Sequence, residues 1–312
     1  MGEKRYFPWT RRQVSGMLFA VVASMLWSVT NVIIRHLVAE LHPVVIGAGL
    51  YFSALTFIVP LYMVLWSRDD GPCLPLWRQP RPRLVVVLAK VGDTLGFIHA
   101  VVYISATQTT ILSKLNAVWT FLILFLFYRR EVGFWSLVGS VVTFAGVYVI
   151  VGGAQVEVTF TPGVLLGFGL AIFCGLSMAV FSVALGKDPA AAVPVSMAQQ
   201  LRFTSSLLGM VLLFLLPFAL MLLPDRWPSA DQLFWLWFGG AFCLGLVYYC
   251  YNGALQRISS LLVVVIAALT IPFTLLLERA FFEVEVTHSL VAGALLIVGG
   301  MIAVSKEGRG AT

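Results

Sequence analysis

Four charged side chains lie inside long apolar runs of the chain, where their charge could take part in chemistry. Lys90, Asp93, Lys114 and Arg202 are flanked by mainly apolar residues, in a chain of 312 residues that is 60% hydrophobic and only 11% charged. Soluble domains are about a quarter charged, so this composition predicts a protein surrounded by lipid. A charge at membrane depth is costly and usually faces a cavity or a partner. These four residues are therefore the first candidates for a site.

Lys90 and Asp93 are three residues apart, so a helix would place both side chains on one face. Asp93 lies about ten residues into its apolar run, which corresponds to the middle of a bilayer. Two interpretations are open. Either the two charges neutralise each other and pack between helices, or Asp93 binds a proton or the ammonium group of a ligand.

Lys114 and Arg202 are cations that could hold a carboxylate, and arginine in particular suits bidentate recognition of such a group. Either cation could instead pair with Asp93 or cap helix carbonyl groups, and these alternatives stay open. His99 shares neither the spacing nor the face of Asp93, so we expect it to pack as a structural residue.

Aromatic and amide side chains also recur deep within the apolar runs. Trp27 and Trp119 fall near the middle of theirs, where the role of an interfacial anchor fits poorly. They could line an apolar cavity for a ligand ring, or they could simply pack. The further candidates for such a cavity carry hydroxyl or amide groups: Asn31, Tyr51, Asn116, Tyr249 and Asn252.

The residues needed for enzymatic, metal or cofactor chemistry do not come together in the sequence. There is no GxxxxGK[ST] phosphate-binding loop, and the 4 histidines are dispersed. Asp93 is the only acid placed clearly within an apolar run, so paired carboxylates are missing. The 4 cysteines show no metal-binding or disulfide spacing. We therefore expect no catalytic residue, no metal and no cofactor.

Ten apolar runs are long enough to cross a bilayer, which takes roughly 20 residues per helix. They cover residues 14–37, 43–66, 83–105, 107–128, 134–153, 163–185, 195–223, 231–255, 259–278 and 287–305. Short connections and two small tails make up the remainder, so no soluble domain is expected. The sequence predicts an all-α integral membrane protein with ten transmembrane helices.

The positions of the cations predict the orientation of the chain. Most of the 20 Lys and Arg residues fall on the side of the N-terminus, whereas Arg35, Arg226 and Arg279 fall at the opposite ends of the spans. Positive residues are enriched on the cytoplasmic side of a membrane. We expect both termini in the cytoplasm and a location in the plasma membrane. The net charge of +6 forms no single basic patch, so no nucleic-acid partner is expected, and the oligomeric state is left open.

The chain contains an internal repeat, in which residues 104–153 align with residues 258–307 at an offset of 154. The matched pairs include Ile104 and Ile258, Ser105 and Ser259, Gly139 and Gly293, and Gly146 and Gly300. Earlier segments align at offsets of 151 and 147, a drift that insertions in the loops would produce. Each copy holds five spans, an odd number, so the second copy enters the membrane from the opposite side. Inverted repeats of this kind are typical of many secondary transporters.

The order of several short motifs resembles the drug/metabolite transporter superfamily, and in particular its ten-helix permeases with two EamA domains. The motifs are Leu26-Trp27-Ser28 followed by Arg35, Leu201-Arg202-Phe203, the Thr/Ser-rich start of the fourth run, Pro272, and an acidic residue before two spaced glycines (Glu131, Gly139 and Gly146; Glu285, Gly293 and Gly300). The resemblance covers about residues 14–305 and implies one EamA-like repeat over 14–153 and a second over 163–305. The halves differ chemically, because Tyr51 stands opposite Arg202 and Val118 stands opposite Pro272.

The resemblance and the inverted repeat together imply a secondary transporter in a lipid bilayer. It would move a small metabolite, such as an amino acid or a related amphipathic solute, by export or exchange through alternating access. Asp93 is the candidate coupling residue, with protons as the coupling ion. Lys114 or Arg202 would hold an anionic group of the substrate, and Trp27 and Trp119 would flank its apolar part. A membrane-embedded enzyme and a channel are the alternatives.

Overall fold

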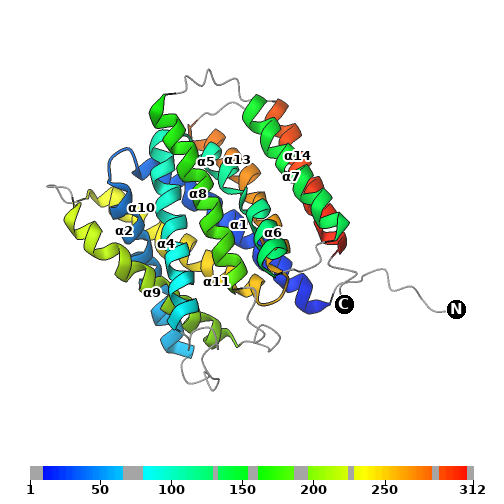
Figure 1. The fold of residues 1–312 in the computed structure, drawn as a ribbon. Coiled ribbons are helices and arrows are strands. Elements are labelled where there is room, and N and C mark those ends of the chain that lie inside the picture. Colours follow the sequence, from blue (N-terminus) through cyan, green and yellow to red (C-terminus); the bar gives the residue numbers. More distant parts are fainter. Residues whose placement is uncertain are drawn as a thin grey trace.

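The fold is a single bundle of helices, seen from the side in Figure 1. The computed structural model describes residues 10–65, 80–128, 133–153, 161–185, 196–223, 228–282 and 288–307, and all regular secondary structure in these ranges is helical. The motif residues Glu131 and Glu285 lie outside the described residues.

Two repeats of five spans make up the bundle. The first contains α1 (Arg11–Leu37), α2 (Pro43–Leu65), α4 (Pro80–Tyr103), α5 (Ala106–Ser113) continued by α6 (Asn116–Tyr128), and α7 (Phe134–Gly153). The second contains α8 (Pro162–Leu185), α9 (Met197–Met221), α10 (Ala230–Phe238) with η3 (Gly239–Leu244) and α11 (Gly245–Leu255), α12 (Ser260–Ile266) with η4 (Ala267–Leu269) and α13 (Thr270–Phe282), and α14 (His288–Glu307).

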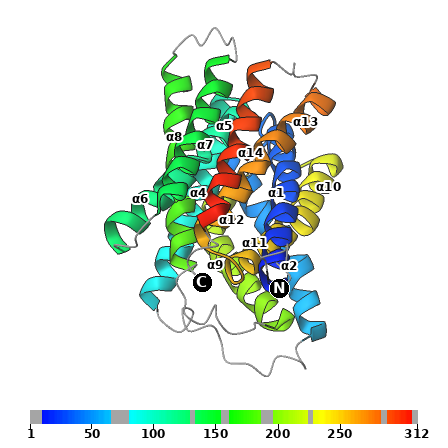
Figure 2. The ribbon, with the colours of Figure 1, turned by 90° about the vertical axis from the view of Figure 1, so that its right-hand side faces the viewer.

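The helices have the length and composition of membrane spans. Among the described residues, eight spans are long and apolar enough to cross a bilayer, and α7 and α14 contain the shorter apolar helices Leu137–Gly146 and Val291–Gly300. The predicted all-α, ten-span membrane fold is confirmed. The first residue of α1 and the last of α14 lie at the same end of the bundle (Figure 2). We call this end the near side and the opposite end the far side.

Hydroxyl residues set where several helices begin. The side chains of Thr10, Ser105 and Ser196 each accept a hydrogen bond from the backbone N–H three residues later, and the glutamine at that position bonds back to the cap. This capping box satisfies N–H groups that the first turn would leave unpaired. Ser259, the repeat partner of Ser105, caps α12 through its own hydroxyl. The repeated serine thus starts the fourth span of both repeats.

The pattern of helix contacts stays the same when each helix is replaced by its counterpart in the other repeat. Helix α2 packs against its counterpart α9, and α7 packs against its counterpart α14, with which it lies side by side in Figure 1. Helix α4 packs against α8, and the exchanged pair, α11 and α1, is also in contact. A two-fold relation between the repeats would produce this pattern.

The crossing of α7 and α14 depends on glycines that the repeat matches. A methyl group on Gly146 would lie 2.6 Å from the carbonyl oxygen of Gly293, and one on Gly300 would lie 2.5 Å from the carbonyl oxygen of Gly139. Such separations leave no room for a side chain, so the glycines permit this close approach. Because the alignment pairs Gly139 with Gly293 and Gly146 with Gly300, the same exchange of repeats relates the two contacts.

Two spans are interrupted at positions that the repeat also relates. Helix α5 gives way to α6 at Lys114-Leu115, and α12 passes into α13 through the tight turn η4. The offset of 154 places Lys114 opposite Ala268, within that turn. The sequence shows each span as one apolar run, so neither interruption was predicted.

Each interruption has a local cause. Pro272 lies in the first turn of α13 and has no N–H group to bond back across η4. Ser113 precedes the other break, and its hydroxyl donates to the carbonyl of Thr110 at 2.8 Å. The same carbonyl still accepts from the Lys114 N–H at 3.2 Å, and the Leu115 N–H bonds to the Leu112 carbonyl three residues back, so the helix tightens at the break. Gly175 of α8 lies against this break, since a methyl group there would be 2.7 Å from the Ser113 carbonyl oxygen.

Candidate functional site

A cavity lies where the two interrupted spans meet, near the middle of the bundle. Its volume is about 60 Å³, and because one water needs roughly 10–15 Å³ on this scale, it has room for a few water molecules. Both repeats line the cavity, with α1, α2, α4, α5 and α6 from the first and α8, η3, α11, η4 and α13 from the second. The lining residues from the two interrupted spans are Thr110, Ser113, Lys114, Asn116, Ala267 and Thr270.

Lys90 and Asp93 form a buried ion pair on α4. The Lys90 side chain is 1% exposed, and its ammonium group lies 4.8 Å from the ring centroid of Tyr248, 5.3 Å from that of Trp27 and 5.6 Å from that of Phe181. These are distances at which an ammonium group is attracted to an aromatic face. The carboxylate and the three rings together fix Lys90, so the geometry matches the interpretation of a mutually neutralised pair.

The second carboxylate oxygen of Asp93 is also occupied. It accepts a hydrogen bond from the thiol of Cys174 on α8, with 3.2 Å between sulfur and oxygen. Cys174 has no metal-binding or disulfide spacing in the sequence, and a lone thiol in a helix usually packs as a small apolar group, so it was not selected as a site residue. Through Lys90 and Cys174, both oxygens of Asp93 have a donor, and the carboxylate joins α4 of the first repeat to α8 of the second.

Lys114 lines the cavity at the break between α5 and α6. The residue is 8% exposed, and its ammonium group lies 5.5 Å from the ring centroid of Trp27. Within the part of the chain that the structure describes, no hydrogen bond or ion pair holds this ammonium group. A buried charge without a partner is costly. Lys114 is therefore the cation that an anionic ligand in the cavity would satisfy.

Two amides beside Lys114 differ in how they are bonded. The amide nitrogen of Asn31 donates to the hydroxyl of Thr110 at 3.0 Å and lies 3.5 Å from that of Thr274. Asn116 is 3% exposed, and its side-chain oxygen has no hydrogen-bond partner among the described residues. Buried acceptors are rarely left unpaired. Asn116 can therefore accept a hydrogen bond from a hydroxyl or N–H group of a ligand.

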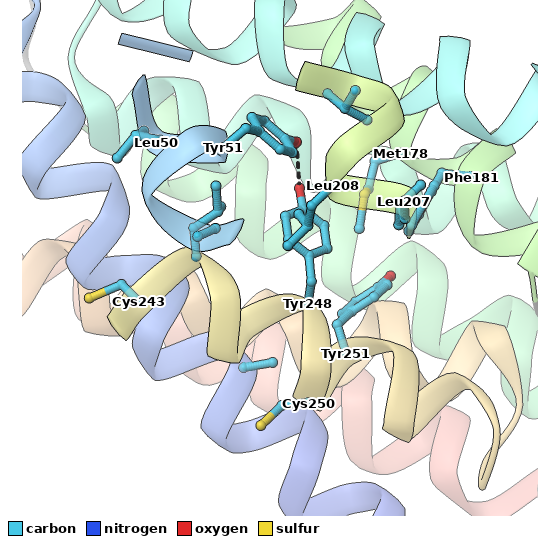
Figure 3. Packing of buried hydrophobic residues seen from close by; sticks show 14 of the residues in the cluster. Leu50, Tyr51, Met178, Phe181, Leu207, Leu208, Cys243, Tyr248, Cys250 and Tyr251 are labelled. Atoms are coloured by element: carbon cyan, nitrogen blue, oxygen red, sulfur yellow. Dashed lines mark hydrogen bonds between the residues drawn. The ribbon is translucent and has the colours of Figure 1, made fainter. Parts of the chain in front are cut away.

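Two tyrosines close the side of the cavity formed by α2 and α11. The hydroxyl groups of Tyr51 and Tyr248 are 3.0 Å apart and point toward one another in Figure 3. The Tyr51 hydroxyl also lies 2.8 Å from that of Thr94 on α4. These bonds fix both rings against the cavity and leave their faces to a ligand or to Lys90.

Comparison with known proteins identifies the family of the chain. Residues 14–152 and 161–306 each match the EamA-like transporter family. The chain belongs to the EamA-like transporter family. It is therefore a multi-pass membrane transporter of the drug/metabolite transporter superfamily, and members of this family are typically not enzymes.

A solved crystal structure of another protein has the same fold as this transporter. The two superpose with a TM-score of 0.71 over 95% of this chain and 99% of the other, at 19% sequence identity. At such low identity the likeness concerns the fold alone. No curated protein matches the chain.

Six of the residues that the sequence proposes for a site are brought together around the cavity of the transporter. They are Trp27, Asn31, Tyr51, Asp93, Lys114 and Asn116. The cavity also has lining residues that sequence reasoning did not select, among them Cys174, Met178 and Thr270. Thr270 could have been selected from the sequence, because the repeat offset of 154 aligns it with the candidate residue Asn116.

The other four proposed residues do not line this cavity. Asn252 donates to the hydroxyl of Thr204 at 3.2 Å and thereby joins α11 to α9. The ring of Tyr249 meets that of Phe19 edge-on, with 6.1 Å between centroids. Tyr249 directly follows Tyr248, which lines the cavity, so the rotation of α11 separates these two residues.

Trp119 and Arg202 are the remaining two, and His99 also lies outside the lining. Trp119 is half-buried on α6, and Arg202 is half-buried on α9. The Nδ1 atom of His99 lies 2.9 Å from the carbonyl oxygen of Leu95, one turn earlier in the same helix.

A second intramembrane acid, Glu278, was missed. The prediction that Asp93 is the only acid clearly within a span was wrong, because α13 continues to Phe282 and Glu278 is 0% exposed inside it. Arg35 of α1 forms an ion pair with one carboxylate oxygen, and Thr107 of α5 donates to the other. Arg35, a basic residue near the far end of the first span, was the sequence feature that could have indicated a buried acidic partner. We call Arg35, Thr107 and Glu278 the far-side cluster.

Proposed function

We propose that the protein is a secondary transporter that carries a small amphipathic metabolite with an anionic group by alternating access. The observation that carries the proposal is the buried ammonium group of Lys114, which has no ion-pair partner in the described ranges and faces a cavity at a helix break. A central site at discontinuous helices of inverted repeats is the arrangement of many secondary transporters.

The start of α6 adds to the positive field of Lys114. Asn116 is the first residue of α6 and lines the cavity. The N-terminal end of a helix carries a partial positive charge and unpaired N–H groups, which attract anions. A substrate carboxylate beside Lys114 would therefore also be stabilised by this helix start.

The apolar part of the substrate would lie against the aromatic and aliphatic lining. Trp27, Leu50, Phe97, Ile98 and Leu244 contribute this surface. A ligand pocket of this kind, mainly apolar with few polar groups, fixes orientation through its polar groups and gains affinity from the apolar contact. Amphipathic metabolites such as amino acids and related acids have this shape.

We further propose protons as the coupling ion and Asp93 as the coupling residue. Asp93 bonds to Lys90 within the first repeat and to Cys174 in the second. Protonation of the carboxylate would weaken the ion pair and loosen the contact between α4 and α8. Proton binding would thus bias the relative position of the repeats, which is the motion that alternating access needs.

For its location, we propose the plasma membrane with the near side in the cytoplasm. Arg11 and Arg12 begin α1 on the near side, and Arg257 follows α11 there. An excess of positive residues marks the cytoplasmic side. Reporter fusions at both termini test this orientation, since an external terminus would contradict it.

Counterflow in proteoliposomes tests the transport function. Vesicles loaded with a pooled panel of amino acids and related organic acids should take up a labelled member faster than empty vesicles do. Lys114→Met should reduce this exchange about tenfold or more, because it removes a charge-assisted contact, and Lys114→Arg should retain part of it.

Unfolding temperature and gel-filtration profile serve as controls for the folding of both variants. If no solute exchanges faster than through protein-free liposomes, the transporter proposal fails. Flux without stimulation by solute on the opposite side would instead favour a channel.

A further inference from the structure

We infer that the substrate is an organic monoanion that lacks an ammonium group, bound through its carboxylate beside Lys114. This inference rests on the proposed function and narrows its substrate from amphipathic metabolites in general to one charge class.

The charge balance of the cavity carries the inference. In the described part of the chain, the charged side chains that line it are Lys90, Asp93 and Lys114. Lys90 and Asp93 neutralise each other, which leaves the single positive charge of Lys114. A bound monoanion brings the net charge of the cavity to zero. A zwitterion leaves this net charge at +1, and a cation raises it to +2. Because uncompensated charge is costly in a low-dielectric interior, the monoanion is the best occupant.

Among the described residues that line this cavity, an ammonium group of a substrate would find no free carboxylate. One oxygen of Asp93 is bonded to Lys90 and the other to the Cys174 thiol. To reach Asp93, the ligand would have to displace Lys90, whose ammonium group is enclosed by the rings of Trp27 and Tyr248. Two cations would then compete for one carboxylate.

The unpaired polar group next to Lys114 is a neutral acceptor. The side-chain oxygen of Asn116 lacks a partner among the described residues. An amide oxygen satisfies a hydroxyl or neutral N–H group with one hydrogen bond, but it does not compensate the charge of an ammonium group. The polar groups of the cavity therefore fit a carboxylic acid, whose apolar body would require the cavity of about 60 Å³ to widen, and a hydroxyl group beside the carboxylate would add a bond to Asn116.

Matched ligands that share an apolar skeleton and differ in their polar groups and charge test this inference on the purified full-length protein. Two skeletons are used, each as carboxylate, amide, amine and amino acid. The first set is 4-methylpentanoate, 4-methylpentanamide, 3-methylbutylamine and leucine, and the second is 3-phenylpropionate, 3-phenylpropionamide, 2-phenylethylamine and phenylalanine. Binding is measured by calorimetry and by the shift in unfolding temperature.

The carboxylate of at least one skeleton should bind about tenfold or more tightly than its three matched partners. Lys114→Met should abolish this preference. Lys114→Glu reverses the net charge and should favour the amine instead. If the Glu variant does not fold, the wild-type series and Lys114→Met still decide the question.

Equal or tighter binding of the amino acid or the amine to the wild type would overturn the inference, as would carboxylate binding that survives in Lys114→Met. Binding of no member of either set would overturn it as well. Counterflow separates these failures from a failure of the proposed function. If a zwitterionic amino acid exchanges in the pooled panel, the transporter function stands and the monoanion inference falls.

Discussion

Lys90 and Lys114 are the same residue type at similar depth, yet different groups surround their ammonium groups. Lys90 is enclosed by a carboxylate and three aromatic rings. Lys114 meets only the face of Trp27 at 5.5 Å, and no carboxylate lies within ion-pair distance in the described ranges. A paired buried charge has mainly a structural role, whereas an unpaired charge at a cavity is a candidate for binding a ligand of opposite charge. The sequence placed both cations within apolar spans, and only their surroundings in the fold separate them.

Removal of one partner of the Lys90–Asp93 pair should be more harmful than removal of both. Lys90→Met leaves a buried carboxylate without its counter-ion, which costs about 3–5 kcal/mol. The double variant Lys90→Met with Asp93→Asn should recover most of this loss, because no uncompensated charge remains. Thermal unfolding in detergent measures Lys90→Met, Asp93→Asn and the double variant. A double variant less stable than either single variant would show that the pair is not the source of the effect.

Asp93→Asn also tests the coupling role. If Asp93 binds the coupling proton, counterflow by this variant should lose its dependence on pH while exchange continues at a fixed rate. Wild-type protein in the same vesicles is the control, with the unfolding temperature of the variant checked first. Unchanged pH dependence would remove Asp93 from the coupling role and leave it as the partner of Lys90.

At the scale of elements, the interruptions of the fourth and ninth spans bring the site together. Each break turns one apolar run into two helices, so that α6 and α13 both begin at the cavity. Gly175 lets α8 approach the first break, where its backbone contacts the Ser113 carbonyl. The repeat predicted that the two spans correspond, but the tight turn η4 and the break at Lys114 depend on hydrogen bonds between neighbouring residues, which apolar periodicity does not show.

Substitution of Gly175 should disturb the site through this contact. In Gly175→Ala the new methyl group would lie 2.7 Å from the Ser113 carbonyl oxygen, so α8 and the break must separate, at a cost of about 1–3 kcal/mol. Transport should fall with it, because Lys114 follows Ser113 directly. Gly169→Ala is the matched control on the same helix, since no atom lies within 4 Å of its added methyl group. Similar stability and transport in the two alanine variants would contradict this role of Gly175.

At the scale of the whole molecule, the two repeats share their packing but not their charges. The exchange relates α4–α8 to α11–α1 and the glycine contacts of α7 and α14 to each other. Lys114, however, stands opposite Ala268, and Tyr51 stands opposite Arg202. Symmetric contacts of this kind would allow two equivalent packings of the repeats, which the proposed alternating access requires. The asymmetric residues give the cavity, over its described lining residues, a net charge of +1.

The far-side cluster spans both repeats and should hold that end of the bundle closed. Glu278 of the second repeat bonds to Arg35 and Thr107 of the first. Glu278→Gln removes the ionic attraction, so the far side should open more often. The readout is Ile34→Cys in a cysteine-free background, because Ile34 lines the cavity one residue before Arg35. With Glu278→Gln added, this cysteine should react about tenfold faster with an impermeant maleimide applied from the far side than it does without that substitution.

Glu40→Gln is the control for this experiment, because Glu40 is an exposed far-side acid that bonds to Gln232. Labelling at position 34 should not change in this variant. An equal labelling rate in Glu278→Gln and the unmodified background would show that the far-side cluster does not control closure.

The fold class, the number of spans and the internal repeat could be predicted from the sequence, because they follow from composition, the length of apolar runs and the order of residues. A bilayer requires an apolar run of fixed length and a backbone that satisfies its own hydrogen bonds, so composition and run length predict ten helices. The order of Gly139, Gly146, Gly293 and Gly300 predicts the two copies, since glycines are needed where helices cross closely.

The site depended on the tertiary structure, because the rotation and partners of each helix decide which polar groups meet. Trp27 and Trp119 lie at similar depth, yet Trp27 lines the cavity and Trp119 does not. Most of these spans are apolar around their whole circumference, so the sequence does not mark the face that turns inward. The burial of Glu278 likewise depended on Arg35 from a helix more than two hundred residues away in the chain. The sequence alone therefore determined a duplicated bundle in a membrane, and tertiary packing determined which buried charge lacks an ion-pair partner among the described residues.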